Sequence, residues 1–154
     1  MALRTRPWRL LLTSALFLVL TLGASLWLLV SDQGRRHNES LARDLRLHAL
    51  LLQGLVERRW PSLTDGPVAE AVANLRADGI DLAILTTAGD ALVPPRIGTD
   101  DEIARLPEVQ LARTQGAAHS ARRWGPDQRD VVTVAVRLDA EPAGGVLWLS
   151  RPAW

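Results

Sequence analysis

Side chains capable of chemistry are few in this chain, and they do not form a catalytic pattern. The sequence holds three histidines (His37, His48 and His119) and no cysteine. Metal binding and acid–base catalysis need such side chains to converge with carboxylates, and no two of these histidines stand at a ligand-like spacing. There is also no G-x-S-x-G nucleophile motif. We therefore predict no catalytic residue, no metal site and no cofactor.

One set of basic residues could bind an anion. His119, Arg122 and Arg123 fall in one expected strand, and Arg137 falls in the next, where the sheet could bring it alongside. Arginine suits a carboxylate because its planar fork binds two oxygens at once. These four residues are our candidates for binding a small anionic ligand, although a solvent-facing strand would show the same pattern.

The acidic run Asp100-Asp101-Glu102 could offer oxygen ligands to a divalent cation. Helix capping explains it better, because acids in a first helical turn favour the helix dipole.

The charge balance gives no case for a nucleic-acid partner. The sequence has 18 basic and 17 acidic residues. Arg4, Arg6 and Arg9 are three of the basic ones, so the chain beyond them is close to neutral. Nucleic-acid binding needs a basic face.

The N-terminal part of the chain reads as a membrane anchor. Residues 10–30 form a run of 21 residues without a charge, and a helix of that length spans roughly 30 Å, the thickness of bilayer hydrocarbon. The basic tail, residues 1–9, contains no acid and is therefore expected in the cytoplasm. We expect a single-pass protein of the inner or plasma membrane, with residues 31–154 outside the cytoplasm.

A cleaved signal peptide is the competing interpretation, since Gly23-Ala24-Ser25 resembles a cleavage site. Cleavage there would leave the apolar segment LWLLV at the mature N-terminus, so we favour the uncleaved anchor. Either interpretation exports the rest of the chain.

Residues 31–60 are expected to form the juxtamembrane region, with a polar junction at 31–38 followed by a helix from about 39 to 59. Apolar positions along 39–59 recur at spacings of four and three, which is a heptad seam. We predict that this seam contacts a second copy of the chain; its residues are Leu41, Leu45, His48, Leu52 and Leu55. His48 could be an ordinary packed residue of that contact or a pH-responsive one, because two facing imidazoliums would repel.

Residues 61–154 are expected to form one α+β domain. Helices are predicted at 67–77, after a cap at Thr99 or Asp100, and from Pro107 to Gly116, since proline suits the first helical turn. Strands are predicted at 80–87, 91–93, 117–124, 130–138 and 146–151. Hairpins and short helices join these strands, so the sheet should be antiparallel, about five strands wide and flanked by helices.

Three segments in this domain resemble the extracytoplasmic sensor domain of two-component sensor histidine kinases, of PAS-like or single-Cache fold and phosphate-regulon type. They are the hairpin DLAILTTAGDALV, the helix-loop-strand ARLPEVQLARTQGAAHSARR and the closing hairpin VVTVAVRLDAEPAGGVLWLSRPAW. Their order and spacing match the family over residues 31–154.

The resemblance implies more than the sequence contains. In that family a second membrane helix, a dimerisation helix with a phosphoacceptor histidine and an ATP-binding domain follow. We find no such histidine box or nucleotide motif, so we expect the sensing piece of a homodimeric receptor that reaches a response regulator only through a missing kinase region. Two alternatives stay open: a complete single-pass binding or assembly protein, and a sensor attached to a cyclic-dinucleotide synthase or chemotaxis output.

Overall fold

The computed structural model describes residues 7–60, 62–63, 66–139 and 144–153. The chain divides into two compact units, Met1–His37 and Asn38–Trp154. Helix α1 (Pro7–Arg59) contributes residues to both units.

In the first unit the structure describes the N-terminal part of α1, which includes its apolar stretch. Among the described residues, α1 is the helix long and apolar enough to cross a membrane. Its most apolar stretch of 18 residues has a mean hydropathy of 2.1, and no side chain in that stretch is buried. Segment 31–38, which we expected to form a polar junction, is helical. A glycine costs a helix only about 1 kcal/mol, and Asp32 and Arg36 form a 2.8 Å ion pair one turn apart across Gly34.

The second unit is built on a five-stranded antiparallel sheet. Its strands are β1 (Asp81–Thr86), β2 (Ala91–Val93), β3 (Ala117–Trp124), β4 (Arg129–Leu138) and β5 (Gly145–Pro152). They lie in the order β2-β1-β5-β4-β3, so β5 occupies the centre between β1 and β4. The expected α+β fold with a five-stranded sheet is therefore confirmed.

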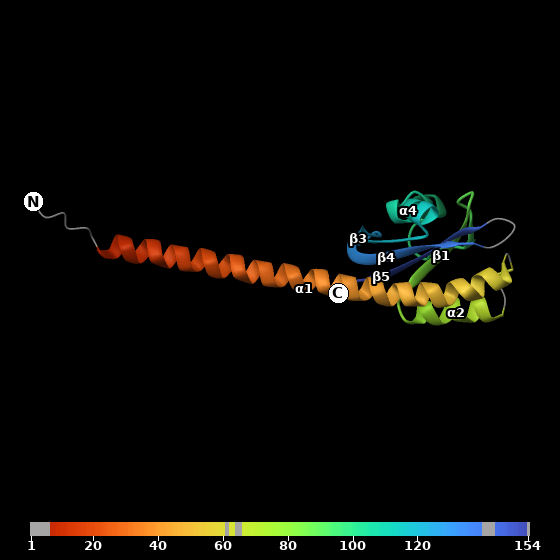
Figure 1. Cartoon of the computed structure of the whole chain (residues 1–154), viewed down its shortest axis with the longest axis horizontal. Helices are drawn as coiled ribbons and strands as arrows, with labels where there is room; N and C mark the ends of the chain where they lie inside the picture. Colours follow the sequence, from red (N-terminus) through yellow and green to blue (C-terminus); the bar gives the residue numbers. More distant parts are fainter. Residues whose placement is uncertain (1–6, 61, 64–65, 140–143, 154) are drawn as a thin grey trace, which may run out of the picture. The chain divides into compact units, whose positions relative to one another are not determined.

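Helices cover both faces of this sheet (Figure 1). The C-terminal half of α1 and α2 (Pro67–Ala77) pack on one face, and α3 (Asp100–Ala104) and α4 (Pro107–Gln115) pack on the other. Each face has its own hydrophobic core. Val132 and Val134 point into the first core, whereas Ala135 and Trp148 point into the second.

Local sequence signals account for most of these elements. Thr99 caps α3 with a full capping box. The Thr99 hydroxyl accepts from the Glu102 backbone N–H, and the Glu102 carboxylate accepts from the Thr99 backbone N–H. Pro67 and Pro107 start α2 and α4 as expected. The predicted strand limits agree with the structure to within one residue at each end. The turn expected around residues 139–145 lies partly outside the described residues.

Candidate ligand-binding site

The four predicted ligand residues divide between the two faces of the sheet. His119 is paired with Val134, whose side chain lies on the sheet face that α1 covers, so His119 is on that face too. Arg123 lies four residues farther along β3 and is on the same face. Arg122 is opposite Val131 and bonds to Glu108 of α4, so it is on the other face. Arg137 shares that α4 face but lies toward the opposite end of β4. The four side chains therefore do not converge on one pocket.

His119 lies in a hollow between α1 and the edge strand β3. This hollow has a volume of about 270 Å³ and is lined by Glu39, Arg43 and Arg46 together with small apolar residues. All four polar side chains are exposed to solvent. Farther along β3, Arg123 pairs with Asp130 at 3.4 Å, and both side chains are exposed.

Arg122 belongs to a buried polar cluster beneath α4. It forms an ion pair with Glu108, whose side chain is 1% exposed, against 21% for Arg122. The second Glu108 oxygen accepts a 2.7 Å hydrogen bond from Thr133 on β4. Burial lowers the pKa of Arg122 from its ordinary value, but a guanidinium stays charged at neutral pH. The Arg122 guanidinium is therefore already paired with Glu108 of its own chain.

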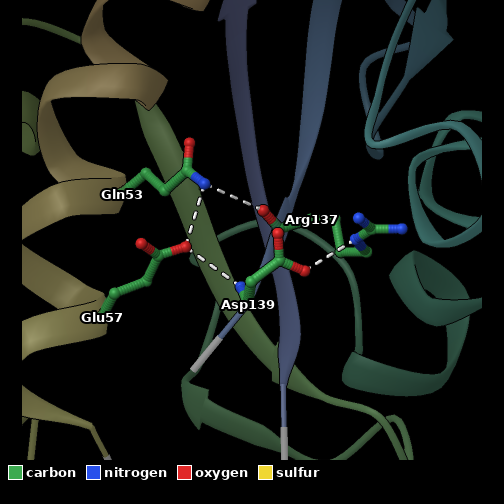
Figure 2. A network of polar contacts seen from close by, with 4 residues as sticks. All are labelled: Gln53, Glu57, Arg137 and Asp139. Atoms are coloured by element: carbon green, nitrogen blue, oxygen red, sulfur yellow. Dashed lines mark hydrogen bonds and ion pairs between the residues drawn. The ribbon is translucent and has the colours of Figure 1, made fainter. Parts of the chain in front are cut away.

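Arg137 takes part in a network that joins β4 to α1 (Figure 2). Gln53 donates from Nε2 to the Arg137 carbonyl at 3.2 Å and to Glu57 Oε1 at 2.9 Å. The backbone N–H of Asp139 donates to the same Glu57 oxygen at 3.0 Å. The Arg137 guanidinium points away from α1 and donates to Asp139 Oδ1 at 2.9 Å (Figure 2).

On the far side of this network the Arg137 side chain lines a cavity of about 370 Å³. The cavity is also lined by Thr87, Arg113, Leu138, Asp139 and Val146. Leu138 contributes its backbone there, because its side chain packs in the core on the α1 face. Arg113 comes from α4 and is half-buried. Its Nε and Nη2 atoms are buried and have no hydrogen-bond partner among the described residues. The cavity thus brings two guanidinium groups to one place, and sequence reasoning had identified only Arg137.

The predicted dimer seam is largely used inside the chain itself. Leu45 and Leu52 are 0% and 2% exposed and belong to the core between α1 and the sheet, with Leu41 at its margin. His48 is half-buried and donates from Nδ1 to the Asp44 carbonyl at 3.0 Å, within the same helix. Leu55 is 38% exposed. The predicted residues therefore do not form one surface open to a partner, and dimerisation itself stays a prediction.

No group of three or more histidine, aspartate or glutamate side chains gathers to hold a metal ion within the part of the chain that the structure describes.

No protein-family model matches the chain, and no curated protein is similar to it in sequence. Solved structures do share its fold. The ligand-binding domain of the Campylobacter jejuni chemoreceptor Tlp3 in complex with 4-methylisoleucine matches 79% of this chain, with a TM-score of 0.56 and 15% identity. The sensory domain of Tlp3 with isoleucine bound gives a TM-score of 0.55 over the same share.

This chain covers 56% of the first Tlp3 structure, and so spans just over half the length of the receptor domain it matches. The sensor domain of the zinc-responsive histidine kinase CzcS from Pseudomonas aeruginosa aligns with 20% identity over 71% of this chain and 93% of that one. Its TM-score of 0.29 is too low to argue from. The comparisons thus establish that this chain and the Tlp3 ligand-binding domain share a fold.

Proposed function

We propose that this chain is the sensor region of a membrane-anchored signalling receptor, with a two-component sensor histidine kinase as the leading candidate for the whole protein. One observation carries the proposal: a domain with the fold of a chemoreceptor ligand-binding domain is joined, through a single helix, to an apolar segment long enough to cross a membrane. Among sensor histidine kinases, we propose the phosphate-regulon type for the whole protein.

The proposed topology has the basic tail in the cytoplasm and the folded domain outside it, in line with the positive-inside rule. A signal sequence would have the same apolar character. The two are separable by experiment, because cleavage near residue 25 would release a shorter, membrane-free protein.

We infer a small-molecule stimulus. The Tlp3 structures hold isoleucine, L-valine or 4-methylisoleucine, and these ligands are compact zwitterions that each carry one carboxylate. In our chain the sheet face covered by α4 offers a cavity lined by cationic side chains, which makes a small anionic ligand the leading class.

We further propose that the chain acts as a homodimer through the solvent-facing side of α1. Leu47, Leu50 and Leu51 are 58%, 50% and 74% exposed, and Leu55 continues their stripe. Leucines at such spacings on one helix face pack well against an identical helix, because the surface is then self-complementary. A second copy would also have its own anchor in the same membrane, so the two anchors would run parallel to each other.

The signal would then pass from the domain to α1. Glu57 and Gln53 bond to the end of β4, where Arg137 and Asp139 line the cavity. A ligand that displaced this end of β4 would shift α1 against its partner, and the shift would continue into the membrane segment.

Cysteine crosslinking in membranes tests the dimer without background, because the natural chain has no cysteine. We expect Leu47→Cys and Leu51→Cys to give disulfide-linked dimers, while the matched control Leu45→Cys, buried in the core, gives none. Crosslinking without helical periodicity would refute this interface.

Reporter fusions test the topology. An alkaline phosphatase fused after Trp154 should be active and stay in the membrane fraction after alkaline washing. An inactive reporter would reverse the orientation, and a released, shortened product would replace the anchor with a signal peptide.

The coding DNA beyond the codon for Trp154 tests the kinase assignment. An in-frame apolar run followed by a phosphoacceptor histidine box supports a sensor kinase. A stop codon favours the alternative, a single-pass binding or assembly protein without a kinase, and a cyclase or chemotaxis module favours the third option.

A further inference from the structure

The two outer edges of the sheet differ in how much free backbone they offer. Strand β2 is three residues long and is followed by Pro94-Pro95, which cannot donate backbone hydrogen bonds. Strand β3, at the other edge, has eight residues, no proline and an unbroken register with β4. No strand pairs with the outer edge of β3 within the part of the chain that the structure describes. A long, regular edge of this kind is a template for another extended segment.

Alternate residues of β3 direct their backbone groups outward. The Gly116 carbonyl accepts from the Arg137 N–H at 2.8 Å, and the Ser120 carbonyl accepts from the Thr133 hydroxyl of β4 at 3.3 Å. Backbone groups alternate in direction along a strand, so the even-numbered residues of β3 face β4 and the odd-numbered ones face away. The residues whose N–H and C=O groups remain for a further strand are Ala117, His119, Ala121 and Arg123.

Beside this edge, on the face that α1 covers, lies the hollow that contains His119. Its volume is about 270 Å³, and the start of β3 contributes two small residues to it, Ala117 and Ala118. An added strand would direct every second side chain toward this face. Those side chains would therefore have room between the edge of the sheet and the helix.

One stretch of α1 supplies charge to the hollow. Arg43 and Arg46 line it and are exposed, and Glu39 is the acid among its lining residues. Neither arginine forms an ion pair within residues 7–60, 62–63, 66–139 and 144–153, where the ion pairs of α1 use Asp32 and Asp44. This excess of positive charge favours acidic side chains on an incoming strand, because charge-assisted hydrogen bonds are stronger than neutral ones.

A second copy of this chain would be a poor occupant of the edge. If β3 paired with itself across a two-fold axis, both α1 helices would lie on the same face of the extended sheet. The seam would then hold two sets of the same cations, including Arg43, Arg46 and Arg123. Like charges across a strand pair are destabilising, so the edge favours an acidic partner over a copy of itself.

We propose that the outer edge of β3 is a docking site for an extended, acidic segment of another protein, which adds to the sheet as an antiparallel strand. In such a pair, residues directly opposite each other share a face and exchange both backbone bonds. The acidic residues that reach Arg43 and Arg46 are therefore also the residues whose N–H groups bond to β3. This inference goes beyond the proposed sensor function and does not depend on it.

Titration calorimetry on the full chain in detergent tests the site. The probe is a blocked peptide of alternating threonine and glutamate, so that all its acids can lie on one face. We expect saturable binding of one peptide per chain. The matched peptide with glutamine in place of glutamate should bind about threefold to tenfold more weakly, because the ion pairs that it loses are exposed.

Methylation of the peptide backbone separates strand addition from simple charge attraction. A methyl group on a backbone nitrogen removes a hydrogen-bond donor and leaves the charge unchanged. Methylation at the glutamates should abolish binding, because their N–H groups face β3 in the antiparallel arrangement. Methylation at the threonines, whose N–H groups face away, should leave binding nearly unchanged. Equal binding of the two methylated peptides would overturn the proposal, and the reverse order would overturn the antiparallel arrangement.

Variants of the protein locate the site. Arg43→Gln with Arg46→Gln should weaken binding of the glutamate peptide about threefold to tenfold. The matched control, Arg58→Gln with Arg59→Gln, changes two exposed arginines in the last turn of α1 outside the hollow and should leave binding unchanged. Ala121→Pro removes an outward N–H but no bond to β4, so it should abolish binding. Thermal melting shows whether each variant is folded.

Failure of the glutamate peptide to bind the natural chain would overturn the proposal. Undiminished binding to the folded Arg43→Gln, Arg46→Gln variant would also overturn it, and so would an equal loss in the control pair. Dimers that dissociate on Ala121→Pro in sedimentation experiments would assign the edge to a second copy instead. If Ala121→Pro does not fold, the methylated peptides make the same test on the natural chain. None of these results bears on the anchor or the output domain, which the reporter fusions and the coding DNA test separately.

Discussion

The backbone N–H of Asp139, just beyond β4, donates a 3.0 Å hydrogen bond to Glu57 Oε1 on α1. The two residues are 82 positions apart in the sequence. The same glutamate oxygen also accepts from Gln53, so one carboxylate holds one turn of α1 and the end of a strand together. Since Asp139 also lines the cavity, this bond connects the candidate ligand site with the helix that leads to the membrane segment.

Removing the Glu57 carboxylate should loosen this connection. We expect Glu57→Ala to lower the free energy of unfolding by about 1 kcal/mol, because the bonds lost are partly exposed and water replaces them. Urea denaturation of the detergent-solubilised chain measures this. Glu57→Gln, which keeps an oxygen acceptor, should stay close to the natural chain; an equal loss in both variants would show that the bonds themselves contribute little.

The Glu108–Arg122 pair should be far more sensitive. Arg122→Met leaves the Glu108 carboxylate, whose side chain is 1% exposed, without its counter-charge, and we expect a loss of about 3–5 kcal/mol. Replacing both residues, as Glu108→Leu with Arg122→Met, should recover most of that loss because no buried charge is left.

The same unfolding measurement has an internal control for this pair. Arg129→Met removes an exposed ion pair with Asp127, at 60% and 64% exposure, and should cost under about 1 kcal/mol. A cost for Arg122→Met no larger than that would contradict the buried role assigned to Glu108.

Two glycines of the domain should respond to alanine in opposite directions. A Cβ at Gly145 would collide with the Leu85 carbonyl oxygen and also come within 3.0 Å of the Trp60 ring. Gly145→Ala should therefore destabilise the domain by about 1–3 kcal/mol or more, because the new methyl group overpacks against backbone. Gly54, inside α1, has open space around it, so Gly54→Ala should stabilise the helix by up to about 1 kcal/mol. Thermal melting of both variants is sufficient, and a neutral Gly145→Ala would contradict the close β1–β5 packing.

The leucines of α1 should separate into core and surface positions. Leu45→Ala removes a fully buried side chain and should cost about 2–5 kcal/mol. Leu51→Ala removes one that is 74% exposed and should change the unfolding of an isolated chain by under about 0.5 kcal/mol. Denaturation of dilute protein, with association measured separately by analytical ultracentrifugation, checks both. A large loss at position 51 in dilute protein would reverse the assignment of the two helix faces.

Local patterns explain why the fold could be predicted well from the sequence. The alternation in DVVTVAVRL places Val132, Val134 and Val136 on one side of β4, and that side faces α1. Proline at positions 67 and 107 and the capping box at Thr99 mark helix starts that do not depend on distant contacts. Each signal acts within a few residues, so tertiary structure had little to override.

The helix seam shows what a periodic pattern leaves undecided. A stripe of leucines at heptad spacing fits a partner helix and a covering sheet equally well, because both present an apolar surface. In the structure the domain's own sheet takes Leu45 and Leu52, together with Ala42, Ala49 and Val56. Leu47, Leu50 and Leu51, which the seam had left out, stay exposed. Leu55 of the seam is also exposed, at 38%.

The candidate site was the least predictable part, because it depends on which strand face each cation occupies and on a partner from another element. Arg122 and Arg123 are neighbours in the sequence, but they point to opposite faces, and only Arg122 reaches Glu108. Arg113 lies near the end of a short helix, where a cation is expected to favour the dipole. Only the approach of α4 to the ends of β4 and β5 makes it part of a cavity.

The central place of β5 has a consequence for how the domain is made. Strands β1 and β4 pair with β5 on either side and not with each other. Until residues 145–152 have left the ribosome, the sheet lacks its central strand, and the segments of the β1–β2 and β3–β4 hairpins have nothing to join them. Folding must therefore wait for this late segment and close contacts of long sequence separation, which is a slow step. A chain that stays unfolded for so long can still pass through a translocation channel, as the proposed export of the domain requires.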